Sequence, residues 1–417
     1  MIIYMLNKNL WDYMFGALAK NLYYLLLFAL GICGLVMFIR KKETRMISVS
    51  FIIYAVVIVL NGYLIANAEQ RSEGFVEYLV YPLPMFALAY CMNYKHTYTG
   101  IIKIMPYWGV ITSLLAGLEY FTKTPILPTS YEGIYRFFDG STSFRSVVFI
   151  GSPMILSVLL GISLITAIYL SEFEKNKNYK KYIPIIFLGI LFTGSRGPLV
   201  STLMGIILMY YLRAKHERKN KKIIGFFVWS FFLLFLILLK MSLFPDFETG
   251  ISFVDNTISR FGSSFNLSEW GNKERILRWT YYINQFIKYP LFGYGIASTS
   301  ASVISNAKVT LHGITTESGV LARLVETGVV GVIPYYCMFI CSIKISISQL
   351  KRDVGKLNQS IFYIISGILC LYIVENLILQ ISLDIYCTFF AWLFIAYGIN
   401  VKHFILHQES CSSDLLR

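Results

Sequence analysis

Charged residues are scarce in this sequence. Asp, Glu, Lys and Arg make up 14% of the 417 residues, whereas soluble globular domains contain about 25%. Apolar residues reach 56% and occur in long runs. These runs are too many and too long for the core of a soluble protein. The composition therefore predicts a membrane protein that crosses the bilayer several times.

Motifs of several common chemistries are absent. The seven cysteines are scattered without a CxxC pair, so neither a redox motif nor a zinc site of that spacing is expected. The sequence contains no Walker A loop and no GxSxG elbow. The net charge of +14 comes from short basic clusters between apolar runs. Membrane orientation produces that pattern, so no nucleic-acid partner is expected.

Eleven segments are apolar enough to be candidate membrane helices. They are residues 21–39, 46–66, 76–93, 104–121, 146–170, 183–195, 197–212, 223–240, 317–343, 360–381 and 385–401. Residues 1–19 could add an interfacial helix or a twelfth span. The expected fold class is all-α: a polytopic bundle of about 11–12 transmembrane helices that forms a single transmembrane domain over residues 1–417.

The basic clusters define an orientation. Four of them, after the first, fifth, seventh and ninth candidate helices, fall on one side if the helices alternate, and that side is cytoplasmic. Residues 122–145 and 241–316 are then outer loops. Within the second loop, residues 274–288 have the spacing of an amphipathic helix on the membrane surface. Its expected apolar face consists of Ile276, Trp279, Ile283 and Phe286.

Arg196 lies at the centre of an almost wholly apolar stretch. A charge inside hydrocarbon is costly, so such a residue normally faces a partner or a water-filled path. Residues 183–212 are too few for two full spans, which predicts a short hairpin with its turn below the outer surface. Gly197 and Pro198 are expected to break the helix, and the helix start after them suits an anion. Alternatively, Arg196 reaches the lipid headgroups or pairs with Glu375.

Three more arginines belong to the predicted outer side. Arg275 and Arg278 share one face of the expected surface helix, and Arg145 begins the fifth candidate span. Guanidinium groups bind phosphates bidentately, so several of them near the outer boundary would suit a diphosphate. For each arginine alone, attraction to anionic lipid headgroups is a strong alternative.

His312 is the one histidine that this topology places outside. A neutral imidazole can accept a proton near pH 7, although a lone histidine is often only a polar surface residue. Arg323 lies between Glu317 and Glu326, and it has the i,i+3 spacing to pair with Glu326. Glu375 lies in an apolar helix, which makes it either a site residue or the structural partner of an arginine.

Three segments, in this order, resemble the O-antigen ligase and polymerase superfamily. FTGSRGPLV resembles its SRG hairpin, and RILRWTYYINQFIKYPLFGYG resembles its Arg-x-x-x-Trp segment followed by Pro-x-x-Gly-x-Gly. LHGITTESGVLARLVETGVVG resembles its His-Asn segment before Leu-x-Glu-x-Gly-x-x-Gly, with glycine after His312 instead of asparagine. FRSVVFIGSP is a looser match, at Arg145, to an Arg-x-x-Gly segment. The matching positions are Arg196, Arg275, Trp279, Pro290, Gly293, Gly295, His312, Glu326, Gly328 and Gly331.

The resemblance implies a GT-C-like, metal-independent glycosyltransferase without a cofactor. It would act on undecaprenyl-diphosphate-linked oligosaccharides at the outer face of the plasma membrane. Arg196 and Arg275 would hold the diphosphate, and His312 would deprotonate the attacking hydroxyl, oriented by Glu317 or Glu326. The remaining candidate substrate-binding residues are Arg278, Arg145, Glu317, Glu326, Arg323 and Glu375.

Two kinds of transfer fit the resemblance. A polymerase moves the growing O-antigen or capsular glycan onto the next lipid-linked unit, and a ligase moves it onto another acceptor. Polymerases diverge more in sequence, which favours a polymerase. A flippase or transporter for such glycans is the alternative from another class, but the sequence shows no internal repeat. The implied partners are the lipid-linked glycans and membrane lipids, together with a chain-length regulator and a flippase.

Overall fold

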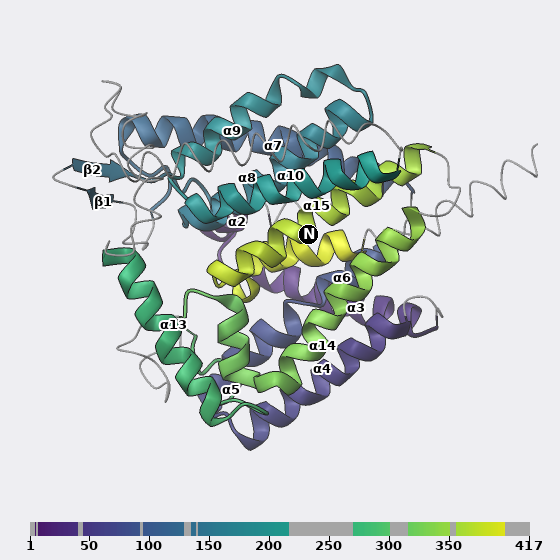
Figure 1. Cartoon of the computed structure of the whole chain (residues 1–417), viewed down its shortest axis with the longest axis vertical. Helices are drawn as coiled ribbons and strands as arrows, with labels where there is room; N and C mark the ends of the chain where they lie inside the picture. Colours follow the sequence, from purple (N-terminus) through teal and green to yellow (C-terminus); the bar gives the residue numbers. More distant parts are fainter. Residues whose placement is uncertain are drawn as a thin grey trace, which may run out of the picture. The chain divides into compact units, whose positions relative to one another are not determined.

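The computed structural model describes residues 5, 7–40, 45–91, 95–128, 135–138, 141–216, 270–300, 316–350 and 356–396. These residues are helical apart from their turns and one short strand pair (Figure 1). They divide into two compact units. Unit 1 comprises Met1–Met5, Ala17–Gly100 and Ile276–Arg417, and unit 2 comprises Leu6–Gly16 and Ile101–Arg275.

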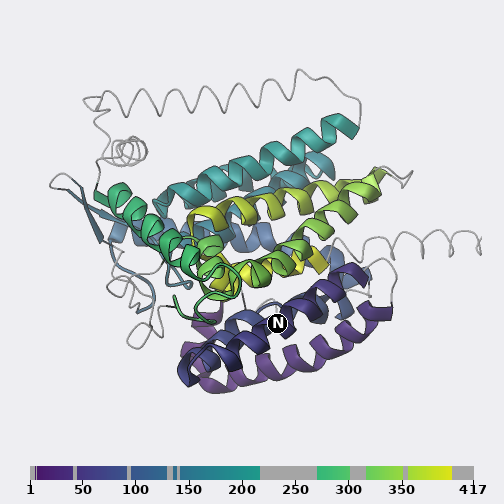
Figure 2. The ribbon, with the colours of Figure 1, turned by 60° about the horizontal axis from the view of Figure 1, so that its bottom comes forward.

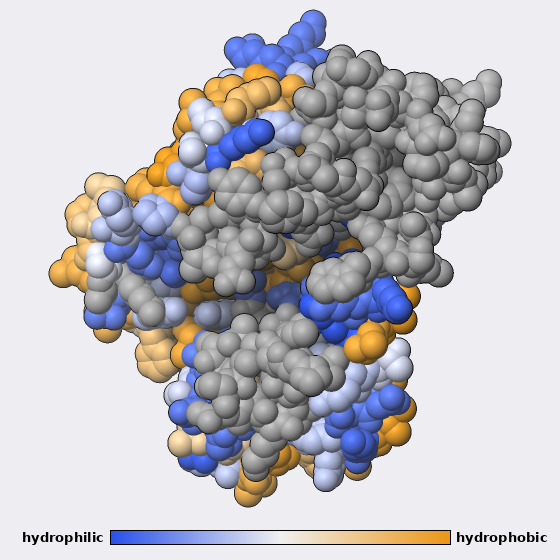
Figure 3. Space-filling view, turned by 90° about the vertical axis from the view of Figure 1, so that its left-hand side faces the viewer, coloured by the Kyte–Doolittle hydropathy of each residue, from blue (hydrophilic) through white to orange (hydrophobic). Residues whose placement is uncertain are grey.

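Five of the described helices are long and apolar enough to cross a membrane, which confirms the expected multi-pass, all-helical class. They are Arg45–Leu64, Pro153–Phe173, Arg196–Lys215, Gly319–Ile345 and Ile361–Ile378, and two shorter apolar helices are Asn21–Met37 and Ile385–Ala396. Many large apolar side chains are exposed, as expected for surfaces that face lipid (Figure 3). The candidate span 223–240 lies outside the described residues.

Unit 1 combines helices from both ends of the sequence. Its elements are α3 (Ala17–Arg40), α4 (Arg45–Leu64), α5 (Ala68–Phe75), the π-helical turn η1 (Val76–Val80), α6 (Pro84–Cys91), α14 (Gly319–Leu350), α15 (Lys356–Ile378) and the 3-10 turn η7 (Ile381–Leu383). α4 packs along α14, α14 along α15, and α3 along α6. Figure 2 shows α3 and α4 side by side.

The expected span 76–93 is not one helix. It is divided into η1, a turn at residues 81–83 and α6. α3 approaches α6 so closely that a Cβ on Gly34 would lie 1.9 Å from the carbonyl oxygen of Phe86. The short helix is therefore held by packing against a long neighbour, which an apolar run alone does not reveal.

Unit 2 surrounds one deeply buried helix. Its elements are α2 (Lys8–Phe15), α7 (Lys95–Thr122) from Ile101 onward, β1 (Tyr135–Phe138), β2 (Ser141–Phe144), α8 (Pro153–Ile168), the π-helical turn η3 (Tyr169–Phe173), the 3-10 turn η4 (Lys177–Tyr179), α9 (Tyr182–Phe192), α10 (Arg196–His216) and the start of α13 (Trp270–Lys288). α8 packs against both α9 and α10. It is apolar on all its faces because it is buried on all of them.

Two details of unit 2 differ from the sequence prediction. The segment predicted to be the first outer loop contains an antiparallel pair, β1 and β2, in which Tyr135 pairs with Phe144 and Phe138 with Ser141. The fifth span begins at Pro153, not at residue 146, because Val148 and Gly151 adopt positive φ angles and Pro153 starts the helix.

Candidate active site

The SRG segment forms the expected tight turn between two helices. α9 ends at Phe192 and α10 begins at Arg196. The break lies at Gly194, which has a φ of 58°, and not at Gly197 and Pro198 as predicted. Pro198 instead occupies the first turn of α10, where its missing N–H has no helical acceptor in any case. Arg196 is thus the first residue of a membrane helix, and its side chain is half-buried.

Arg145 forms hydrogen bonds with residues of this turn. The residue is buried, with 3% of its surface exposed. The Nε donates to the carbonyl oxygen of Thr193 at 3.1 Å, and an Nη donates to the Oγ of Ser195 at 2.8 Å. The backbone N–H of Ser146 donates to the carbonyl of Phe192 at 3.2 Å. Unit 2 therefore brings Arg145 and the SRG turn together, although they are 50 residues apart in the sequence.

Glu119, near the end of α7, belongs to the same cluster and was not predicted. Its buried carboxylate accepts the N–H of Ile126 at 2.7 Å, of Val147 at 2.8 Å and of Val148 at 2.9 Å. An acidic residue in an apolar run is the signal that singled out Glu375, and it applies equally to Glu119.

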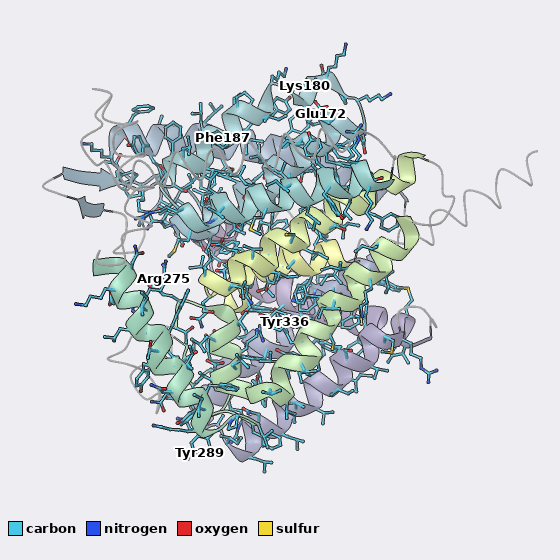
Figure 4. All side chains as sticks on the ribbon, in the orientation of Figure 1. Glu172, Lys180, Phe187, Arg275, Tyr289 and Tyr336 are labelled. Atoms are coloured by element: carbon cyan, nitrogen blue, oxygen red, sulfur yellow. The ribbon has the colours of Figure 1, made fainter. Side chains whose placement is uncertain are left out.

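α13 carries two of the predicted arginines on one face. Figure 4 places Arg275 near the start of α13 and Tyr289 directly after its end. One turn after Arg275, Arg278 donates to the carboxylate of Glu317 at 2.6 Å, and both side chains are partly buried. This ion pair joins α13 to the residues immediately before α14.

The amphipathic helix is present, but its packed face differs from the prediction. Trp279, Tyr282 and Phe286 pack on Leu321 and Val325 of α14. Two residues of the predicted apolar face, Ile276 and Ile283, are each 47% exposed. The buried stripe is spaced three and four residues apart and includes a tyrosine that the prediction did not count as apolar. The exposed isoleucines form a second apolar face.

Tyr294 connects the segment after α13 to this helix. Its hydroxyl donates to the side-chain oxygen of Gln285 at 2.8 Å. Burial, and then the neighbouring Tyr289 and Tyr281, raise the pKa of Tyr294 above its ordinary value. The hydroxyl therefore stays protonated at neutral pH and remains a donor.

α14 is interrupted at Gly328, which has a φ of 63° and a ψ of −170°. The interruption leaves backbone groups without helical partners, and the YPLFGYG segment satisfies them. The four bonds are Tyr294 N–H to Val325 O at 2.8 Å, Gly295 N–H to Glu326 O at 3.0 Å, Val329 N–H to Pro290 O at 2.9 Å and Val330 N–H to Leu291 O at 3.2 Å. Irregular backbone in a membrane helix requires such internal pairing. The glycine-rich segments of the resemblance therefore pack on each other.

Glu326 anchors the turn that follows this segment. Its fully buried carboxylate accepts the N–H of Ala297 at 3.0 Å, the N–H of Thr299 at 2.9 Å and the hydroxyl of Thr299 at 2.6 Å. The hydroxyl of Tyr78 also donates to it. These four donors satisfy the buried carboxyl group and hold the turn at residues 297–299 against α14.

Arg323 does not pair with Glu326, so the i,i+3 interpretation was wrong. The buried guanidinium donates to the hydroxyl of Tyr54 at 2.7 Å and to the carbonyl of Ser382 at 2.8 Å. It also lies over the rings of Tyr78 and Tyr335, 4.6 and 3.8 Å from their centroids. Tertiary partners thus replace the local pairing because Glu326 is occupied by the turn at residues 297–299.

Two further residues that sequence reasoning missed complete this network. Asn61 of α4 donates to the carbonyl of Phe292 at 2.7 Å and accepts the N–H of Ile296 at 2.7 Å. Glu77 of η1 accepts the hydroxyl of Ser300 at 3.3 Å. Both are polar residues within predicted apolar spans, so the same intramembrane signal would have found them.

The remaining predicted residues belong to different units. Glu375 is buried in α15 of unit 1, whereas Arg196 belongs to unit 2, so their predicted pairing stays a prediction. Beside Glu375, Asn376 donates to the hydroxyl of Tyr336 at 2.5 Å, and Tyr336 is labelled in Figure 4. His312 lies outside the described residues. The convergence of Arg196, Arg275 and His312 stays a prediction.

The fold and these two clusters define a multi-pass membrane protein with buried arginines and carboxylates around a hairpin turn and an interrupted helix. Residues 182–336 match the family model described as O-Antigen ligase (Wzy_C). The matched segment begins with α9 and includes the SRG turn, α13 and the interruption of α14. No curated protein matches the chain. The match confirms the resemblance over this segment and indicates an enzyme of the ligase or polymerase type, which transfers lipid-linked glycans.

Proposed function

We propose that this protein polymerises undecaprenyl-diphosphate-linked oligosaccharide repeat units of an O-antigen or a capsular polysaccharide. It transfers the growing glycan onto the next lipid-linked unit at the outer face of the plasma membrane. The observation that carries this proposal is the position of Arg196. It is the first residue of a membrane helix, in a turn braced by buried side chains, inside the segment that matches the family.

The reaction is a displacement at the C1 atom of a sugar. The bond from C1 to the phosphate oxygen breaks, and a bond from C1 to the acceptor hydroxyl oxygen forms. The lipid diphosphate leaves with the bonding electrons, and the hydroxyl proton passes to His312. Arg196, together with the N–H groups in the first turn of α10, stabilises the charge that develops on the leaving phosphate. Arg275 supplies a second guanidinium.

The other predicted site residues divide by their exposure. Arg278 and Glu317 are partly exposed and can contact a substrate. Arg323, Glu326 and Glu375 are fully enclosed, so they act by holding α14, α15 and the turn after YPLFGYG in place. The exposed isoleucines of α13 support a place for this helix on the membrane surface, beside the lipid part of the substrate.

Analysis of lipid-linked glycans in cells with and without the gene tests the proposed function. For a polymerase, single repeat units on undecaprenyl diphosphate accumulate outside the cell when the gene is removed. A ligase predicts long chains that stay on the lipid and fail to reach another acceptor. Units that accumulate on the cytoplasmic side would contradict both and would point to a flippase.

Arg275→Lys is expected to lower transfer activity roughly tenfold or more, because lysine keeps the charge but cannot make a bidentate phosphate contact. Transfer by purified protein from a lipid-diphosphate donor measures the effect. The matched control is Arg213→Lys in α10, where Arg213 lies over the ring of Phe173 at 4.4 Å. If Arg275→Lys transfers as fast as the parent, Arg275 only attracts lipid headgroups.

A further inference from the structure

Glu119 is a buried acid that no part of the proposed mechanism uses. It lies near the end of α7 and is fully inaccessible to solvent. One oxygen accepts the N–H of Ile126, and the other accepts the N–H groups of both Val147 and Val148. A buried carboxylate is costly unless hydrogen bonds compensate it, and here three backbone donors do so. The acid therefore fixes the chain just before α8.

The segment held by Glu119 is strained. Val148 has a φ of 47°, which is very unfavourable for a β-branched residue. Such strain persists only where the surroundings determine the conformation, and it is concentrated at functional sites. The N–H groups of Val147 and Val148 donate to Glu119, and the hydroxyl of Ser146 donates to the carbonyl of Ala116 at 2.6 Å. α7 therefore holds residues 146–148 in one conformation.

The strained segment presents Arg145 to the SRG turn. Arg145 immediately precedes Ser146, and its guanidinium bonds Thr193 and Ser195, the residues on either side of Gly194. Ser195 is followed directly by Arg196. A continuous series of hydrogen bonds and short chain segments thus connects the carboxylate of Glu119 to the backbone of Arg196, entirely within unit 2.

We propose that Glu119 and Arg145 are positioning residues that set the location of Arg196. Glu119 holds residues 147 and 148 by hydrogen bonds, and these residues fix the position of Arg145. Arg145 in turn bonds Thr193 and Ser195, which fixes the turn directly before Arg196. The catalytic part of this inference rests on the proposed function, because a misplacement of about 1 Å can lower a rate roughly 100-fold. Arg145 then acts through the protein and not as a direct ligand of the diphosphate.

The first test is a double-mutant cycle in the transfer assay. Glu119→Gln leaves one oxygen to accept hydrogen bonds and replaces the other by an NH₂ group, which donates and cannot accept. In either orientation of the amide, the N–H of Ile126 or the N–H groups of Val147 and Val148 lose their acceptor. We expect kcat to fall roughly 10- to 100-fold with little change in the donor KM. In an Arg196→Lys background, the same substitution should add little, because the residue it positions is already impaired. Equal losses in both backgrounds would show a general structural role and overturn the proposal.

The matched control is Glu172→Gln. Glu172 belongs to unit 2 and pairs with Lys180 at 3.2 Å, and both side chains are exposed (Figure 4). This substitution removes an acidic charge from the same unit without touching the SRG turn. It is expected to leave kcat and KM unchanged.

The second test does not depend on catalysis. A thiol is introduced as Arg196→Cys, and its labelling rate by a small methanethiosulfonate reagent is measured in membranes with and without Glu119→Gln. We expect the rate to change severalfold, with the parent chain giving the contribution of the native cysteines. An unchanged rate would overturn the positioning role. If the rate changes but the parent transfers no glycan, the proposed function fails and the structural inference stands.

Ser195→Ala serves as the second variant in case Glu119→Gln does not accumulate in the membrane. It removes the acceptor of one Arg145 bond and leaves the partners of Glu119 intact. The labelling rate at position 196 should change in the same direction by a smaller factor. No change in this variant would equally contradict the proposal.

Discussion

Arg196→Ala is expected to abolish polymer formation in cells while the amount of protein in the membrane stays normal. Removing one preorganised donor from a site that stabilises developing charge typically lowers kcat by about 10²–10³. Folding should tolerate the change, because Arg196 is half-buried at the start of α10 and alanine is the best helix former. The result is read from the chain-length distribution of the glycan and from the protein level in the membrane fraction.

Arg213→Ala is the control for this experiment. Arg213 lies near the other end of α10, over the ring of Phe173, and has no place in the proposed mechanism. It should give polymer of ordinary length. If Arg196→Ala also gives ordinary polymer, Arg196 does not bind the diphosphate, and the proposal loses the observation on which it depends.

The elements that sequence predicted well depend on local signals. The length of an apolar run is enough to identify α4, α8 and α15 as membrane helices. The hairpin around Arg196 followed from a run too short for two spans, and α13 from its periodicity. Each of these signals lies within about 30 residues of chain. The family resemblance added the order of the segments but not their contacts.

The missed features depend on residues far apart in the sequence. Glu119 could be noticed as an acid in an apolar run. Its hydrogen bonds with the N–H groups of Val147 and Val148 are tertiary contacts, which local sequence does not predict. The i,i+3 rule failed for Arg323 and Glu326 because the hydrogen bonds of each are made to residues distant in the sequence. Local spacing rules describe what isolated helices prefer, and packing in a large helical protein overrides them.

The interruption of α14 shows the same limit. Gly328 and the glycines of the YPLFGYG segment were visible as motif positions. The sequence does not show which N–H and C=O groups of the interrupted helix need partners from another segment. The pairing of residues 290–295 with residues 325–330 satisfies them. It also places the turn that binds Glu326 directly after the paired segment. The glycines therefore have a structural reason that is independent of any catalytic role.

Gly328→Ala is expected to prevent stable folding of unit 1. A φ of 63° with a ψ of −170° belongs to a region that essentially only glycine occupies. A Cβ there would lie 2.2 Å from the carbonyl oxygen of Leu291, which is backbone and cannot move aside without breaking the paired segment. Together, strain and clash should cost about 3 kcal/mol or more. The expected result is a sharp loss of protein from the membrane or, in detergent, a much lower Tm.

Two glycine controls separate the causes of that loss. Gly31→Ala introduces a methyl group into α3 at an ordinary contact, 3.4 Å from the side chain of Leu83, and should change the Tm little. Gly16→Ala places a side chain on a φ of 58° with no atom within 4 Å, so it isolates the backbone strain. The loss in Gly328→Ala should clearly exceed that in Gly16→Ala, because only Gly328 also faces the carbonyl of Leu291. A Tm for Gly328→Ala equal to that of Gly31→Ala would mean that α14 can close its interruption, and that the pairing with YPLFGYG does not determine the fold.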